Sequence, residues 1–256
     1  MLYPILSYLK FLLTSTNQHG IHSPFVFDFV TKCLYDTRKY AEYSHLNAYR
    51  NSLLKREETI LITDFGTGSK VFKTNKRKVK DIAKHAGISK KKQHLLFRMA
   101  HYLNSKFSLE LGTSLGLATI ALAINKNNKV TTVEGCKNTA EVARKHLDAV
   151  ECTSVKIQVG DFEKVIKKFA NTSFDLVYVD GNHNKESTLN YFELLLPFVH
   201  NETLFIFDDI YWSKGMTEAW KEIQNHPKVS VSIDAYYWGL VFFRKEQKKE
   251  SFTVRL

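Results

Sequence analysis

Cysteine is scarce in this chain of 256 residues. Cys33, Cys136 and Cys152 are its three cysteines, and no two of them have the CxxC spacing. Thiols this sparse and irregularly spaced fit neither a disulfide framework nor a structural zinc site, and they are typical of a reducing compartment. The sequence therefore predicts a cytoplasmic protein.

The sequence also has no hydrophobic run long enough to span a membrane. Its N-terminal segment MLYPILSYLKFLL is apolar, but it is short and interrupted by Lys10, whereas a spanning helix needs about 20 apolar residues. The segment lacks a basic leader and a small-residue cleavage site, so it does not look like a signal peptide. Helical spacing places Tyr3, Leu6, Leu9 and Leu13 on one face, which predicts a packed or partner-binding helix.

Acidic residues are fewer than basic ones, and the formal net charge is +11. Basic residues are concentrated in one segment: Lys70, Lys73, Lys76, Arg77, Lys78, Lys80, Lys84, Lys90, Lys91 and Lys92. A basic surface can attract nucleic acid, anionic lipid or acidic substrates. Few aromatic residues, which single-strand binders use for stacking, accompany these lysines. We therefore interpret residues 70–92 as a solvated face or lid, and nucleic-acid binding is the less favoured alternative.

Glycines cluster in two segments of the chain, but neither segment contains a nucleotide-binding motif. The segment DFGTGSK, residues 64–70, does not satisfy the P-loop pattern G-x-x-x-x-G-K-[ST]. We interpret it as a mobile glycine loop, with a substrate lid or a plain connection as alternatives. Residues 112–116 do not satisfy the dinucleotide pattern G-x-G-x-x-G, because Ser114 and Leu117 stand where that pattern needs glycine.

What the chain does contain at this place is a strand, a tight glycine turn and a helix. The strand is FSLEL, residues 107–111, and the turn is GTSLG, followed by an apolar run to Ile124. Such a turn presents backbone N–H groups, and its missing Cβ atoms let a ligand approach the main chain.

From this strand onward, strands and helices alternate. The expected strands are residues 107–111, 129–133, 155–159, 174–179, 203–207, 229–234 and 239–245; the expected helices are 116–125, 138–149, 162–170, 186–199 and 214–225. This alternation predicts an α/β fold with a mostly parallel sheet and helices on both faces. Only four residues separate the last two strands, so they must be antiparallel, because a parallel crossover needs a dozen residues or more. Residues 1–89 are expected to form a mostly helical extension or lid with a basic loop, and residues 90–256 the α/β domain.

The pattern E-x-G-x-x-x-G from Glu110 to Gly116 resembles motif I of the class I S-adenosylmethionine-dependent methyltransferases. Seven strands with an antiparallel last strand are also the Rossmann-like architecture of that family, and the resemblance spans about residues 90–245. It implies S-adenosyl-L-methionine (SAM) as cofactor, with the acidic residue and the glycines at its methionine end. The cofactor-binding residues that it implies are Glu110, Gly112, Thr113, Gly116, Glu134, Asp161 and Asp180.

Two acidic residues at strand ends suit this cofactor. Glu134 lies 18 residues beyond Gly116, and in Rossmann-like sheets an acidic residue about 20 residues on accepts hydrogen bonds from ribose hydroxyls. The alternative for Glu134 is a solvated charge at a strand end. Asp161 ends the next strand; the resemblance implies contact with the adenine amino group, while aspartate is also a favoured N-cap for the helix at 162–170.

Polar residues also end the fourth and fifth strands. Asp180 and His183 follow FDLVYV, and Asp208 and Asp209 follow LFIF. The chain lacks the N/D-P-P-Y motif of exocyclic-amine methyltransferases and instead resembles metal-dependent O-methyltransferases, which place an aspartate at the end of the fourth strand. Three carboxylates suit a divalent ion such as Mg²⁺, so Asp180, Asp208 and Asp209 are the predicted metal ligands. Asp180 and His183 are the predicted catalytic residues, with His183 as base, and Trp212 is the expected wall of the substrate pocket.

The leading hypothesis is thus a SAM-dependent O-methyltransferase that methylates a hydroxyl of a small molecule, assisted by a divalent metal. One alternative is an RNA or other nucleic-acid methyltransferase, for which Lys185 is the candidate lysine near Asp180. The other is a non-catalytic SAM-binding protein. The sequence leaves the substrate and the oligomeric state open, with a homodimer among the alternatives. It departs from the family in the turn before the fifth strand, His200-Asn201-Glu202, which is usually glycine-rich.

Overall fold

The structure, a computed structural model, describes residues 2–63, 74–170 and 172–256. The chain forms two compact units: the first combines Met1–Asp36 with Phe169–Leu256, and the second is Thr37–Lys168. The expected glycine loop at 64–70 lies outside the described residues, as do Lys70 and Lys73. The expected division into an extension and an α/β domain at residue 90 stays a prediction.

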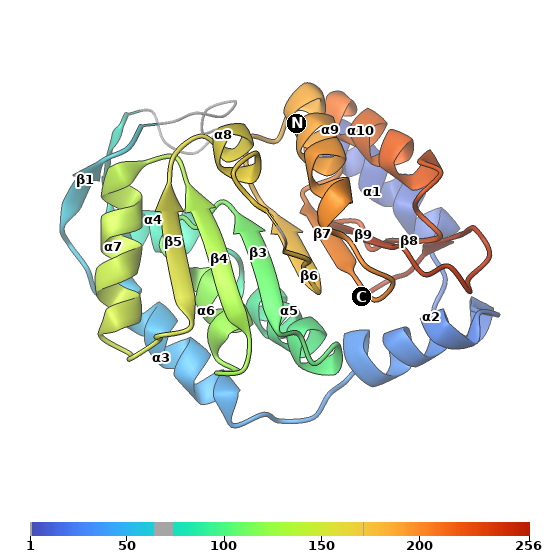
Figure 1. Ribbon diagram of the computed structural model, residues 1–256, viewed down its shortest axis with the longest axis horizontal. Helices are drawn as coiled ribbons and strands as arrows, with labels where there is room; N and C mark the ends of the chain where they lie inside the picture. Colours follow the sequence, from blue (N-terminus) through green and yellow to red (C-terminus); the bar gives the residue numbers. More distant parts are fainter. Residues whose placement is uncertain (1, 64–73, 171) are drawn as a thin grey trace. The chain divides into compact units, whose positions relative to one another are not determined.

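Three parallel strands form the centre of the second unit. They are β3 (Phe107–Leu111), β4 (Lys129–Glu134) and β5 (Val155–Val159), in the order β3-β4-β5 (Figure 1). The last residue of β3, Leu111, pairs with Val133 of β4. Because parallel strands end at the same edge, the turns that follow β3 and β4 start side by side.

Helices and a hairpin complete the second unit. The helices are α3 (Glu42–Leu54), α4 (Val79–His85), α5 (Lys90–Tyr102), α6 (Leu117–Ala123), α7 (Lys137–Asp148) and α8 (Phe162–Ile166). β1 (Thr59–Leu61) pairs antiparallel with β2 (Lys76–Lys78), a strand that the sequence pattern does not predict. The pattern missed β2 because its three basic residues have little strand propensity.

The strands of the first unit include the reversed strand that the sequence predicts. They are β6 (Leu176–Val179), β7 (Leu204–Asp208), β8 (Val231–Asp234), β9 (Trp238–Phe242) and β10 (Glu250–Thr253), in the order β10-β8-β9-β7-β6. β9 is antiparallel to both β7 and β8, whereas β6 is parallel to β7 and β10 to β8. The seven strands expected from residue 107 onward correspond to β3–β9 and do not include β10, because β10 is half-exposed and polar and has no apolar run.

The first unit also holds both ends of the described chain. Its α-helices are α1 (Leu2–Thr14), α2 (Pro24–Phe29), α9 (Lys185–Leu195) and α10 (Lys214–Asn225), with short helical turns at Gln18–Gly20, Val30–Leu34 and Leu196–Phe198. α9 and α10 pack side by side (Figure 1). Ser23 occupies the N-cap position of α2, but its hydroxyl donates to Gln247 Oε1 (3.4 Å) instead of capping the helix.

Helix α1 leaves much of its apolar surface open. Leu6, Leu9 and Leu13 are 58%, 53% and 88% exposed, whereas Phe11 on another side of the helix is buried. The face identified from the sequence is therefore not the one that packs within this unit. Across the described ranges, no helix combines the length and apolar character needed to cross a membrane.

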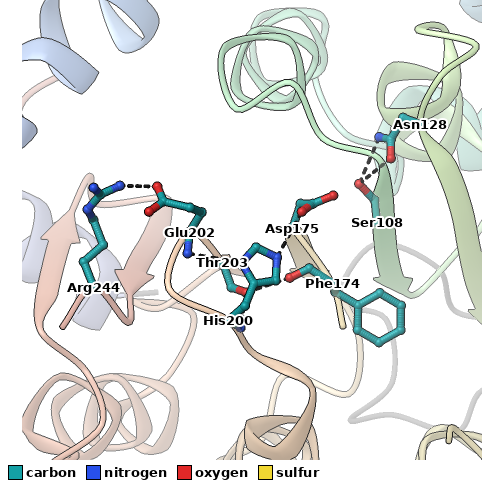
Figure 2. A network of polar contacts seen from close by, with 8 residues as sticks. All are labelled: Ser108, Asn128, Phe174, Asp175, His200, Glu202, Thr203 and Arg244. Carbon is teal, nitrogen blue, oxygen red and sulfur yellow. Dashed lines mark hydrogen bonds and ion pairs between the residues drawn. The ribbon is translucent and has the colours of Figure 1, made fainter. Parts of the chain in front are cut away.

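Polar side chains hold the turn before β7 that lacks glycine (Figure 2). His200 Nε2 lies 3.0 Å from Asp175 Oδ1, and the His200 N–H donates to Thr203 Oγ1 (2.8 Å). Glu202 of the same turn forms an ion pair with Arg244. Side-chain hydrogen bonds thus stabilise a connection for which glycine is the more usual solution.

The predicted α/β fold class is confirmed. From β3 onward the strands are mostly parallel with β9 reversed, and a helix connects each strand from β3 to β7 with the next one. The bounds expected for β3, β5 and α10 agree with the structure to the residue.

Candidate functional site

The turn after β3 has a backbone that favours glycine. Gly112 and Gly116 have φ angles of 107° and 78°, and Ser114 between them has 48°, values that residues with a Cβ rarely adopt. The Gly112 N–H donates to Val133 O (2.9 Å), and the Gly116 N–H donates to Thr113 O (2.8 Å). The turn is thus closed on itself and attached to β4.

Glu134, the last residue of β4, contacts this turn. Its Oε2 accepts a hydrogen bond from the Ser114 N–H (2.8 Å), and its Oε1 accepts one from the Cys136 N–H (2.9 Å). Burial raises the pKa of Glu134, and the backbone donors oppose that rise. Each carboxylate oxygen can accept two hydrogen bonds, so Glu134 keeps capacity for a further donor beside the glycine turn. Its contact with a ribose stays a prediction.

Glu110 is wholly buried inside β3. Its Oε2 accepts hydrogen bonds from Thr119 Oγ1 (2.5 Å) and Thr132 Oγ1 (2.6 Å), and the Thr132 hydroxyl also meets that of Thr113 (2.6 Å). Its other oxygen, Oε1, has no hydrogen-bonding partner among the described residues. Burial raises the pKa of Glu110 to about 8, the two threonine hydroxyls oppose the rise, and the Glu134 charge adds to it. The side chain is therefore mostly protonated at neutral pH.

This raised pKa predicts how stability changes with pH. Between the ordinary pKa of 4.5 and about 8, the folded protein binds more protons at Glu110 than the unfolded chain does. The contribution of Glu110 is therefore fully present below pH 4.5 and is lost as the pH rises toward 8, at about 1.4 kcal/mol per pH unit. Glu110→Gln, which does not titrate, should flatten the fall in free energy of unfolding measured by urea titration across this range. Equal slopes in wild type and variant would contradict the prediction, and Glu141→Gln on the exposed side of α7 is the control.

Asp161 is the N-cap of α8. This exposed side chain accepts a hydrogen bond from the Lys164 N–H through Oδ1 (3.0 Å). The preceding Gly160 has a φ of 155°, and its N–H donates to Glu134 O (2.9 Å). The N-cap interpretation is confirmed, and the adenine contact stays a prediction.

In the first unit, the turn after β6 brings His183 to Asp180. His183 Nε2 lies 3.5 Å from Asp180 Oδ1, and the Tyr178 hydroxyl donates to Asp180 Oδ2 (3.1 Å). Asn182 and His183 have φ angles of 66° and 39°. Such conformations cost on the order of 1–3 kcal/mol each in residues other than glycine, and they cluster at functional sites. The strained turn therefore supports a functional role for the Asp180–His183 pair.

The two acidic residues at the end of β7 have different surroundings. Asp208 is buried, and Asp209 has a φ of 52° while its N–H donates to Tyr237 O (2.8 Å). Within the described part of the chain, no three histidine, cysteine, aspartate or glutamate side chains gather closely enough to hold a metal ion. Asp180, Asp208 and Asp209 thus do not form a ready set of ligands, and their metal binding stays a prediction.

Tyr178 was not identified from the sequence. Tyr178 lies in β6, two residues before Asp180, and this spacing places the two side chains on the same side of the chain. The spacing is the signal that could have identified Tyr178. Trp212, the expected pocket wall, does lie beside the pair: its ring centroid is 6.1 Å from that of His183.

Lys185, the candidate lysine near Asp180 for the nucleic-acid alternative, is engaged elsewhere. Its Nζ lies 2.6 Å from Glu222 Oε1 and 3.3 Å from Glu218 Oε2, both on α10. These carboxylates raise the pKa of Lys185, first through the hydrogen bond with Glu222. Lys185 is thus held by α10, and the nucleic-acid hypothesis, which the basic segment at residues 70–92 motivates, stays an alternative.

The glycine turn and the acidic residues at the strand ends lie in a segment that resembles known proteins. Residues 109–210 match a family described as a methyltransferase domain. This match confirms the resemblance to methyltransferases predicted from the sequence. The reversed strand β9 and the helical segment before α5 lie outside the matched residues.

Individual relatives point the same way. The chain is 30% identical over 129 residues to a catechol O-methyltransferase of Niastella koreensis, covering 48% of this chain and 58% of that protein. It is 24% identical over 159 residues to an Arabidopsis thaliana protein named for caffeoyl-CoA O-methylation, covering 60% of this chain and 65% of that one. The chain therefore spans less than two thirds of either relative.

A solved structure supports the fold over a greater length. The SAH-bound methyltransferase of Podospora anserina aligns with a TM-score of 0.62 at 13% identity, covering 88% of this chain and 98% of that one. At this identity the likeness concerns the fold alone.

Proposed function

We propose that the protein is a SAM-dependent O-methyltransferase that acts on a hydroxyl group of a small molecule. The observation that carries the proposal is the hydrogen bond from the Ser114 N–H to Glu134, which joins the glycine turn to a strand-end carboxylate inside the matched segment. The name of the Niastella koreensis relative supports the reaction, and the SAH in the Podospora anserina structure supports the cofactor.

The cofactor would bind along the strand ends of the second unit. In this proposal Gly112, Thr113 and Gly116 contact its methionine part, Glu134 its ribose hydroxyls and Asp161 its adenine. Glu110 Oε1, buried without a partner among the described residues, is an atom that a polar group of a ligand or an ordered water would satisfy with a hydrogen bond. When bound, SAM supplies a methyl group on a positively charged sulfur, so the protein has to bind and orient it.

His183 would act as the base for the acceptor hydroxyl. In the neutral ring, a proton on Nε2 faces the Asp180 carboxylate, which leaves the lone pair on Nδ1 free to accept the hydroxyl proton. The Tyr178 hydroxyl on the other oxygen of Asp180 keeps that carboxylate in place. The deprotonated oxygen would then be the nucleophile for the methyl group that bound SAM supplies, with S-adenosylhomocysteine as the leaving group. Asp180 is also proposed to contact the cofactor.

The acceptor would be a small and at least partly aromatic molecule. The Trp212 ring beside His183 offers a flat apolar surface, and aromatic rings pack well against one another. Both named relatives act, by their names, on compounds with phenolic rings. None of the three cysteines forms a disulfide bond, which supports the proposed cytoplasmic location.

The divalent metal is tested by chelation. If Asp180, Asp208 and Asp209 hold Mg²⁺ as the sequence predicts, EDTA should abolish methylation, and added Mg²⁺ should restore it, because a bound cation lowers the pKa of the acceptor hydroxyl. Turnover would be measured with matched ionic strength. Full turnover in EDTA would reject the metal assignment while leaving the His183 mechanism in place.

One experiment tests the proposed function as a whole. Calorimetry with SAM and S-adenosylhomocysteine measures cofactor binding, and a panel of catechols, other phenols and glycosides, with RNA as comparison, measures methyl transfer. Binding of the cofactor together with methylation of a hydroxyl is the expected result. Cofactor binding without turnover on any acceptor favours a non-catalytic SAM-binding protein, and no cofactor binding overturns the proposal.

A further inference from the structure

A tyrosine from the helical segment before the methyltransferase-like core touches the glycine turn. Tyr49 of α3 is 2% exposed, and its hydroxyl donates to Leu115 O (2.9 Å) in the middle of the turn. Burial raises the pKa of Tyr49 well above its ordinary value, so the hydroxyl stays protonated and remains a donor. The two residues are 66 positions apart in the chain.

The same hydroxyl lies directly against Gly116. A Cβ added to Gly116 would come within 2.7 Å of Tyr49 Oη, closer than real Cβ contacts allow. The other neighbours of that Cβ would be Leu147 Cδ1 at 3.4 Å and Ala143 Cβ at 3.6 Å. Tyr49 is thus the neighbour that leaves no room for a side chain at Gly116.

A second buried group from α5 holds the next carbonyl. Gln93 is fully buried, and its Nε2 donates to Leu117 O (2.7 Å) at the start of α6. The Arg50 guanidinium of α3 donates to Gln93 Oε1 (3.1 Å) and also to Ile88 O. The backbone carbonyls of Leu115 and Leu117, one on each side of Gly116, are therefore held by side chains from α3 and α5.

We propose that Tyr49 is a positioning residue that sets the place of the glycine turn against the cofactor. The proposal rests on the proposed function, since it assumes that this turn contacts SAM. Its basis is that Tyr49 makes a directional hydrogen bond to the turn and a close contact with Gly116 at once. Helix α3 thereby contributes to cofactor affinity although none of its residues belongs to the glycine motif.

The first test is Tyr49→Phe, which keeps the ring and removes only the hydroxyl. Calorimetry with S-adenosylhomocysteine should show affinity about fivefold or more weaker, because one buried hydrogen bond no longer holds the turn. In turnover assays, the KM for SAM should rise more than kcat falls. Tyr43→Phe on the same helix, whose hydroxyl contacts Arg98 instead, should bind like wild type.

A second variant separates positioning from simple loss of stability. Leu53→Ala truncates a buried side chain of α3 and should lower the melting temperature without weakening the binding of S-adenosylhomocysteine. If Tyr49→Phe binds S-adenosylhomocysteine as tightly as wild type, the inference is overturned. It is also overturned if Leu53→Ala lowers the melting temperature as much as Tyr49→Phe does and weakens binding by the same factor. If wild type itself does not bind S-adenosylhomocysteine, the proposed function has failed.

The contact with Gly116 allows a sharper test. Gly116→Ala should weaken binding strongly in the wild-type background, because its Cβ meets the Tyr49 hydroxyl and its φ of 78° is strained. In the Tyr49→Phe background the contact with the Tyr49 hydroxyl is gone, so Gly116→Ala should weaken binding by a smaller factor. Strictly additive losses would show that the Tyr49 hydroxyl and Gly116 are not coupled, and would overturn the inference.

Discussion

Replacing His183 with alanine should lower kcat by about 10²–10⁴-fold, the usual contribution of a general base. The reason is that His183 is the histidine that the strained turn after β6 brings to Asp180, so without its imidazole the proton of the acceptor hydroxyl would have to go to water. Affinity for SAM should stay unchanged, since the proposed cofactor contacts in the second unit do not include His183. Single-turnover kinetics at saturating SAM measures the chemical step.

The matched control for this variant is His22→Ala, which removes an exposed imidazole in the same unit. It should keep the kcat of wild type. If His183→Ala also keeps full activity, His183 is not the base, and methyl transfer then depends only on binding the two substrates in proximity. A melting temperature within a few degrees of wild type is required for the comparison to count.

The second large effect is expected for Glu134→Ala. This change removes the carboxylate that accepts hydrogen bonds from the Ser114 and Cys136 N–H groups and that is proposed to accept from the ribose. A hydrogen bond to a charged group contributes about 1.5–3 kcal/mol, so the Kd for SAM should rise tenfold or more. Calorimetry measures the affinity directly.

The control for Glu134→Ala is Glu141→Ala on α7, whose carboxylate only faces Lys137 at the surface (3.8 Å). Its affinity for SAM should equal that of wild type. An unchanged Kd in the Glu134 variant would remove Glu134 from the cofactor site, and with it the observation on which the proposed function rests. Reduced affinity in both variants would instead indicate a general effect of lost negative charge.

Much of the fold was predictable because it is encoded by neighbouring residues. The strand at 107–111 and the helix at 214–225 follow from local apolar patterns and agree with β3 and α10. The short connection after β8, three residues in the structure and four by the expected bounds, dictated the reversal of β9. β2 and β10 were missed because both are short and polar, and only the partner strand makes each of them a strand.

The candidate site was predictable to a lesser degree. Glu134 at the end of β4 and Asp180 directly after β6 could be identified as acidic strand ends, because local apolar patterns show where each strand stops. The metal set illustrates the limit: the sequence places three carboxylates after β6 and β7, but the described side chains form no cluster of three. Which atoms meet depends on rotamers and turn conformations that residue types alone do not specify.

By itself, therefore, the sequence determined the alternation of strands and helices, the glycine turn and the order of acidic strand ends, since each depends on residues close together in the chain. Only the tertiary structure decided that the Tyr49 hydroxyl meets the backbone of Leu115 beside Gly116, and that His183 turns back to Asp180 through two left-handed residues. The physical reason is that such contacts arise from packing between distant segments and from backbone strain that the surrounding structure sustains.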